Sequence, residues 1–279
     1  MIVRLTAELT TTPLAKRHQR DVAASALGGR RRIAYGSFDR SKYPAAALSL
    51  ACDAQRSLAI GEYMAVDLFA KLAAALSVAG VPIDIVSAES RIPADEIRHT
   101  DLALQMARAL GDRDEPLEVD TERYRYLGER LSMQDLDIAM LEMHALGESL
   151  ACSLLASSRE RATDPVVKAH YTALLRDEIH HARLGWHYLA WRAPQWSHEE
   201  RQRVADFAGE FIVSTEQIFV RGRDAPRGAV RAARALGVLD TKAQHTAIRT
   251  VMVDEIVPGL DGLGLGASHA WRARRRVWS

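Results

Sequence analysis

The sequence motif Glu-x-x-His, in which x is any residue, occurs at positions 96–99 (Glu-Ile-Arg-His) and again at positions 178–181 (Glu-Ile-His-His). Residues three apart lie on the same face of a helix, so the carboxylate and the imidazole of one motif can bind the same metal ion. Of the ten histidines, His99 and His181 alone have a glutamate three residues before them. A single motif of this kind arises easily by chance, but two copies on paired helical segments favour a two-metal centre.

Two further glutamates lie at a similar distance before each motif. Glu62 precedes Glu96 by 34 residues, and Glu148 precedes Glu178 by 30 residues. Turn-forming residues fall between the members of each pair, at Gly80-Val81-Pro82 and at Asp164-Pro165. This spacing predicts two helical hairpins, each of which brings a glutamate and a Glu-x-x-His motif to the same height.

These six residues resemble the ligand set of the ferritin-like di-iron carboxylate proteins, in which two helices give one Glu each and two give Glu-x-x-His. The set consists of Glu62, Glu96, His99, Glu148, Glu178 and His181. The form Asp-Glu-x-Arg-His at 95–99 is similar to the motif of bacterial multicomponent monooxygenases and acyl-carrier desaturases. The second copy differs, since His180 stands where those enzymes usually have Arg.

The resemblance covers roughly residues 44–192 and implies two iron ions, with a Mn/Fe pair left open, and O2 as co-substrate. Four carboxylates and two neutral imidazoles carry a charge of −4, which two ferrous ions would cancel. Without metal, clustered carboxylates in a helical core have to take up protons. Mostly oxygen ligands with one nitrogen per metal favour iron or manganese, although the affinity order alone does not exclude zinc.

The two aspartates that precede the motifs are candidate partners of the metal-binding histidines. The resemblance implies that Asp95 accepts a hydrogen bond from His181 and that Asp177 accepts one from His99. Arg98 would then hold Asp177 in place. Exposed helical charges are the alternative for both aspartates.

Three more polar residues have candidate roles near the site. His144, one turn before Glu148, is either an additional ligand or pocket donor or a core histidine. The aminoarene N-oxygenases of this superfamily use an extra histidine at a different position, where this chain has Leu174, so the resemblance does not imply N-oxygenation. Tyr171, two turns before Glu178, could line a pocket or take part in radical chemistry, with core packing as the alternative. Glu89 is expected at the surface or along a channel.

Helical periodicity and capping residues predict an all-α fold. The resemblance implies that it is a ferritin-like four-helix bundle, with additional C-terminal helices. The expected bundle helices run from Pro44 to the turn at Gly80, over 83–110 with a break at Pro93, over 132–161, and from the cap Asp164 to Trp191. Within one compact domain we expect an N-terminal arm (1–43), the bundle (44–192), and capping helices with a basic tail (193–279). We expect one helix that begins at the capping box Ser197–Glu200, followed by two shorter helices over 225–236 and 240–257. The tail would then begin at Gly259. A crossover at 111–131 with a short helix through Tyr124 and Tyr126 is expected, and no strand anywhere.

The composition limits the classes of partner. With 37 basic and 36 acidic side chains, the body of the protein is not expected to bind nucleic acid or a membrane surface. Basic residues gather at 16–32 and 272–276, which we interpret as solvated tails. Cys52 and Cys152 lie in apolar helical segments and are expected to be reduced thiols of a cytoplasmic protein. We expect neither a secretory signal nor a membrane span.

The resemblance implies a non-haem di-iron oxygenase or oxidase that hydroxylates, N-oxygenates or desaturates a small organic substrate. The chain has no flavin or nicotinamide motif, so an external electron donor such as a ferredoxin or a reductase is expected, and a homodimer is left open. Arginine far outnumbers lysine. Such an excess is associated with GC-rich bacterial genomes, and it suggests an enzyme of bacterial secondary metabolism. A ferroxidase or iron-storage protein is the alternative, which a cage-sized particle would indicate. A helical interaction protein that keeps an unused site is the least favoured interpretation.

Overall fold

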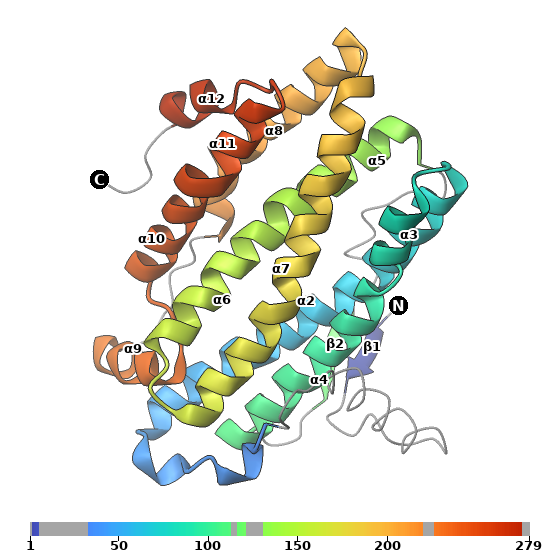
Figure 1. Ribbon diagram of the computed structural model, residues 1–279. Helices are drawn as coiled ribbons and strands as arrows, with labels where there is room; N and C mark the ends of the chain where they lie inside the picture. The colour runs from blue at the N-terminus through green and yellow to red at the C-terminus, as the bar shows by residue number, and fades with distance from the viewer. Residues whose placement is uncertain (1, 6–32, 113–115, 121–130, 220–225, 275–279) are drawn as a thin grey trace, which may run out of the picture.

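The structure is a computed structural model that describes residues 2–5, 33–112, 116–120, 131–219 and 226–274. Long helices run side by side and build a four-helix bundle from two hairpins, with further helices along one side (Figure 1). The predicted all-α class is confirmed.

The first hairpin is formed by α2 (Ala45–Val78), α3 (Ile83–Glu89) and α4 (Ile92–Leu110). Gly80 has a φ of 71°, a left-handed conformation that glycine adopts without a steric penalty, and it turns the chain between α2 and α3. The predicted break lies between α3 and α4. Pro93, in the first turn of α4, has no backbone N–H to continue a helix from α3.

The second hairpin is formed by α5 (Met133–Ala139), a π-helical segment (Met140–Glu148), α6 (Ser149–Arg161) and α7 (Pro165–Arg192). Asp164 caps α7, and its carboxylate accepts hydrogen bonds from the amides of Val166 and Val167. The sequence pattern did not predict the π-helical segment. It matters for the site because His144 and Glu148 lie on it.

The C-terminal helices are α8 (His198–Phe219), α9 (Arg227–Ala233), α10 (Thr241–Val251), α11 (Val257–Gly262) and α12 (Ala267–Ala273). A second π-helical segment, Met252–Ile256, joins α10 to α11. The predicted capping box at the start of α8 is present, since the amide of Ser197 donates to Glu200 and the amide of Glu200 donates to Ser197. The buried side chains of Ile248 and Leu260 belong to the same apolar cluster as Leu150 and Leu189 of the bundle.

Three expectations need correction or fall outside the described residues. The tail predicted from Gly259 is wrong in part, because α11 extends to Gly262 and α12 follows it. The absence of strands is also wrong: β1 (Ile2–Leu5) pairs antiparallel with β2 (Leu117–Asp120). Both strands have only four residues, too few to show a period of two. The basic cluster at 16–32, the expected helix through Tyr124 and Tyr126, and Arg275 and Arg276 lie outside the described residues.

One helical stretch, Met133–Arg161, is long and apolar enough to cross a membrane by length and composition, with half of its most apolar window buried. It packs along α7 and α10 and carries the buried His144, as the core helix of a globular bundle does.

Cys52 and Cys152 are free thiols, and burial raises the pKa of Cys52 to about 11.

Candidate metal centre

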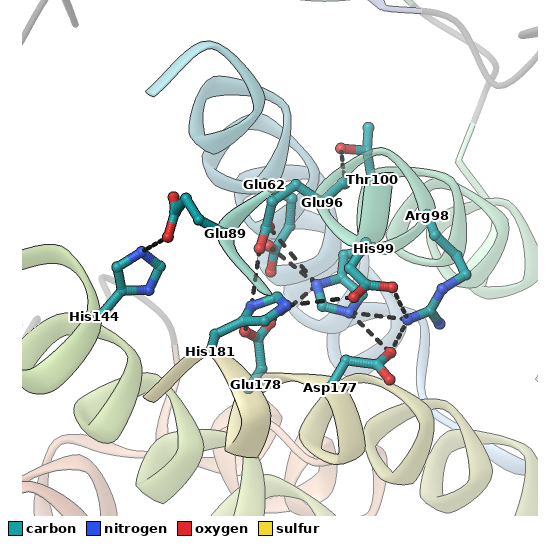
Figure 2. A network of polar contacts seen from close by, with 11 residues as sticks. Glu62, Glu89, Glu96, Arg98, His99, Thr100, His144, Asp177, Glu178 and His181 are labelled. Carbon is teal, nitrogen blue, oxygen red and sulfur yellow. Dashed lines mark hydrogen bonds and ion pairs between the residues drawn. The ribbon is translucent and has the colours of Figure 1, made fainter. Parts of the chain in front are cut away.

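The six side chains predicted as ligands come together inside the bundle. Figure 2 shows five of them, Glu62, Glu96, His99, Glu178 and His181, pointing toward one another. The six side chains come from α2, α4, the end of the π-helical segment and α7. Their ligand atoms form two groups, in each of which the atoms lie within 4.8 Å of one another. One group is Glu62, Glu96, His99 and Glu178, and the other is Glu96, Glu148, Glu178 and His181. Glu96 and Glu178 therefore face both groups.

The two imidazoles point the same ring nitrogen, Nδ1, at the carboxylates. His99 Nδ1 lies 3.0 Å from Glu178 Oε1, and His181 Nδ1 lies 2.9 Å from Glu178 Oε2. His181 Nδ1 also lies 3.1 Å from Glu96 Oε1. The two oxygens of Glu178 thus reach toward different histidines, the arrangement that a carboxylate bridging two metal ions requires.

Burial and mutual repulsion shift the pKa values within the cluster. Burial, together with the charge of Glu96, raises the pKa of Glu62 well above its usual range, and burial with the charge of Glu178 does the same for Glu148. Burial opposes ionisation of Glu178 as well, but the positive charge of His99 outweighs it and lowers the pKa of Glu178. Burial alone would lower the pKa of His99, yet the facing Glu178 raises it.

The cluster leaves buried polar atoms without a hydrogen-bond partner among the described residues. These atoms are Glu96 Oε1, His99 Nδ1, Glu178 Oε2 and both ring nitrogens of His181. A buried polar atom without a partner is costly, and several such atoms that point at one another are typical of a site that binds a cation. Two divalent cations, each with one nitrogen and several carboxylate oxygens, fit this donor set, and oxygen-rich ligation of this kind suits iron or manganese.

The outer nitrogen of each imidazole faces the aspartate of the opposite motif. His99 Nε2 lies 3.3 Å from Asp177 Oδ2, and His181 Nε2 lies 3.6 Å from Asp95 Oδ2. Arg98 forms ion pairs with both aspartates, at 3.2 Å to Asp95. A proton held on Nε2 by an aspartate leaves the Nδ1 lone pair free to bind a metal ion. The structure thus contains the hydrogen bond between His99 and Asp177 that the resemblance implied, whereas His181 Nε2 and Asp95 are within ion-pair distance but form no hydrogen bond. His180, at the position equivalent to Arg98, is exposed.

We expect Asp177→Asn to weaken metal binding about 10- to 100-fold, because the neutral amide no longer fixes the His99 ring with a carboxylate. Equilibrium competition with a chelator measures this affinity. Asp53→Asn is the matched control, since Asp53 is exposed on α2, outside the cluster, and should leave the affinity unchanged. An unchanged affinity in Asp177→Asn would show that the aspartate does not support the site.

The structure places His144 and Tyr171 outside both groups of potential ligands. His144 Nε2 lies 2.8 Å from Glu89 Oε2, and both side chains are fully buried. The surface position expected for Glu89 is therefore wrong. Its spacing from Ile85 and Ile92 already placed it on the apolar face of the helical segment. The Tyr171 hydroxyl accepts a hydrogen bond from Gln55 at 3.0 Å within a second apolar cluster, where it packs in the core.

The raised pKa values predict that metal binding releases protons. Because the pKa values of Glu62, Glu148 and the imidazoles are raised in the metal-free protein, these groups keep their protons to a higher pH than they do in water, and a cation that binds them must displace those protons. Metal affinity should therefore fall as the pH is lowered. Titration of Fe(II) into weakly buffered protein under anaerobic conditions, with a pH indicator, measures the release. Glu62→Gln removes one of these groups and should release fewer protons. Binding without acidification would contradict the protonation described here.

Fold and cluster together define the class: a ferritin-like helical bundle that presents a carboxylate–histidine cluster between its four main helices. No protein-family model matches the chain, and no curated protein matches it. Among solved structures, the chain is similar to "Protein 19 with aldehyde deformylating oxidase activity from Synechococcus". The TM-score is 0.56 at 17% sequence identity, over 82% of this chain and 96% of that chain. At this identity the likeness concerns the fold.

Proposed function

We propose that the protein is a non-haem di-iron oxygenase or oxidase that uses O2 to oxidise a small organic substrate. The observation that carries the proposal is the convergence of four carboxylates and two imidazoles in two overlapping groups at the centre of the bundle. When bound, two iron ions would supply the redox chemistry of O2 reduction. The similarity of the fold to that of a protein with aldehyde deformylating oxidase activity supports this class of function.

The residues of the chain divide the work around the metals. Glu62, Glu96 and His99 would hold one ion, while Glu148, Glu178 and His181 would hold the other. Glu96 and Glu178 belong to both groups, so their carboxylates would help to hold both ions. Glu62 and Glu148, whose pKa values burial raises, can take up or give up protons as the charge at the centre changes.

The walls of the site limit the access of water. Phe69, which is 2% exposed, lies against the ring of His181 with the centroids 6.4 Å apart. Apolar walls keep a reactive centre away from solvent and so protect the oxidation of the substrate from side reactions. Two of the six side chains are partly exposed, Glu62 on α2, whose side chain is 12% exposed, and Glu148 at the end of the π-helical segment.

Reaction outcome and partners belong to the same proposal. Hydroxylation, N-oxygenation and desaturation are all within the chemistry of such a centre, and the name of the similar structure adds aldehydes to the substrates to be tested. We propose an external electron donor such as a ferredoxin or reductase and a place in the cytoplasm. Assembly as a homodimer is left open.

A ferroxidase or iron-storage protein is the second candidate, favoured by the partial exposure of Glu62, which would give Fe(II) a route to the cluster. Such a protein would assemble into a cage and form ferric mineral without an organic substrate. Light scattering coupled to gel filtration separates the two, because an oxygenase of this kind is expected as a monomer or dimer.

The test begins with anaerobic loading of Fe(II), desalting and determination of iron per chain. We expect two iron ions, followed on rapid mixing with O2 by O2 uptake and a transient visible absorbance. Both should be lost in Glu96→Ala and His181→Ala. No iron, or one ion per chain, overturns the di-iron proposal. Two ions with rapid mineral growth and no transient would favour the ferroxidase.

A further inference from the structure

The outward side of α7 carries a row of basic and histidine side chains. Arg176, His180, Arg183 and His187 are spaced by four, three and four residues, so they lie on one face of the helix, and all four are exposed. We call this row the α7 stripe. Ile179, a large apolar side chain that is 36% exposed, lies beside it, one turn from each of the two arginines. The stripe extends about 16 Å along the helix axis, since each helical residue adds about 1.5 Å.

The positive charge of the stripe is not compensated by neighbouring carboxylates. The two acidic residues of α7, Asp177 and Glu178, are both buried, so the exposed surface of this helix includes no acidic side chain. The side chains of the stripe form no hydrogen bond or ion pair with any other described residue. The whole chain has a net charge of only +1, so the stripe is a local concentration of positive charge on a nearly neutral protein.

The stripe lies on the same turns of α7 that carry metal ligands. Glu178 and His181, between Arg176 and Arg183 in the sequence, point into the bundle while the arginines are exposed. In Figure 1, α7 lies at the front of the bundle, and no other described helix crosses its outer side. A helix with its side chains is about 10–12 Å wide, so α7 alone would separate a molecule on the stripe from the ligands. Electron transfer slows steeply with distance, so the stripe marks a short path to the metal centre.

We propose that the α7 stripe is the docking surface for a small acidic iron–sulfur protein that delivers electrons to the metal centre. Unpaired arginines attract the carboxylates of such a partner and orient it before contact. Ile179 adds an apolar contact beside the charges, as in interfaces with an apolar core and a polar rim. Complexes for electron transfer bury little surface, so one helical face is large enough. A nucleic acid fits less well, since two arginines are few for a phosphate backbone.

The inference rests on the proposed function for the need of electrons, whereas docking can be measured on protein without iron. The experiment is calorimetric titration of the full-length protein with an oxidised plant-type 2Fe–2S ferredoxin. We expect one ferredoxin per chain, bound about tenfold more weakly at about 200 mM NaCl than at about 20 mM, because salt screens exposed charges. A single-stranded oligonucleotide should bind more weakly than the ferredoxin. Absence of ferredoxin binding, or tighter binding of the oligonucleotide, overturns the proposal.

Charge reversal tests the stripe directly. The double substitution Arg176→Glu with Arg183→Glu should lower the affinity for the ferredoxin about tenfold or more at low salt, because like charges then face each other. The matched control is Lys242→Glu with Arg249→Glu, two exposed basic residues of α10 that are also seven residues apart, and it should bind as the unaltered protein does. Undiminished binding in the α7 variant, or an equal loss in both variants, overturns the proposal.

The iron-loaded protein adds a kinetic measurement. A reduced 2Fe–2S ferredoxin gives up one electron, so the reduction of two ferric ions to ferrous ions consumes two ferredoxins. The rate should fall in the α7 variant and not in the α10 control, and equal rates overturn the proposal. If no iron is bound, the di-iron proposal fails, while the weaker ferredoxin binding of the α7 variant still supports docking. The two failures are therefore distinguishable.

A measurement on the unaltered protein covers the case in which the α7 variant does not fold. In ¹⁵N spectra of histidine-labelled protein, the ferredoxin should move the signals of His180 and His187, which are assigned through their loss in His180→Gln and His187→Gln. The signal of His269, exposed on α12, should stay in place. Unmoved signals of the stripe, or an equal shift of His269, overturn the proposal.

Discussion

Replacement of Glu178 by alanine is expected to reduce the iron bound after anaerobic loading from two ions per chain to fewer than one. Glu178 and Glu96 are the two carboxylates that belong to both ligand groups, so the loss of either removes an oxygen ligand from each metal at once. Glu178 also faces both imidazoles, with one oxygen toward each. Iron determination after desalting, together with a chelator competition, measures the effect.

The control for this substitution is Glu142→Ala. Glu142 belongs to neither ligand group and lies half-buried on the π-helical segment, so two ions should remain. Circular dichroism before and after loading shows whether Glu178→Ala keeps its helices. A folded Glu178→Ala protein that still binds two irons with unaltered affinity would mean that Glu178 is not a metal ligand.

The ligand cluster could be predicted from the sequence because its geometry is mostly local. The spacing of three residues in each motif fixes a carboxylate and an imidazole on one helical face, whatever the rest of the fold does. The number of residues between Glu62 and Glu96, and between Glu148 and Glu178, predicts a hairpin in each case. A helix has a constant rise per residue, so the two members of each pair return to the same height. The break before α4 could also be predicted, because proline interrupts a helix through its own missing N–H and Pro93 needs no other part of the fold for this effect.

Contacts that depend on how helices face each other could not be derived from spacing. The pairing of His99 with Asp177 crosses from α4 to α7, and the resemblance to a family implied it where periodicity could not. The pairing of Glu89 with His144 was not predicted. His144 lies on the π-helical segment, and a search for apolar residues at the α-helical period does not detect the wider turn of a π-helix. Strands β1 and β2 are far apart in the sequence and too short to show alternation.

The close contact of α7 with the π-helical segment predicts the largest loss of stability, in Gly185→Ala. A Cβ atom at Gly185 would lie 2.6 Å from the Cβ of His144 and 2.9 Å from the Cα of Ala145, distances that packed carbon atoms do not tolerate. Because backbone stands on both sides of the contact, a side chain cannot swing away, and the helices have to separate. We expect a loss of about 1–3 kcal/mol in the free energy of unfolding, measured by urea titration.

The matched control is Gly209→Ala, a helical glycine of α8 whose added Cβ would meet its nearest neighbour, the Cβ of Ala270, at 3.9 Å. There alanine should stabilise the protein by up to about 1 kcal/mol, since it favours the helix without a clash. The opposite signs of the two substitutions separate the effect of the close contact from that of helix propensity. The separation of α7 from the π-helical segment in Gly185→Ala should also displace Glu148 from Glu178, so weaker iron binding is expected together with the lower stability. Equal stability of both variants would mean that the close approach of these helices does not contribute to the fold.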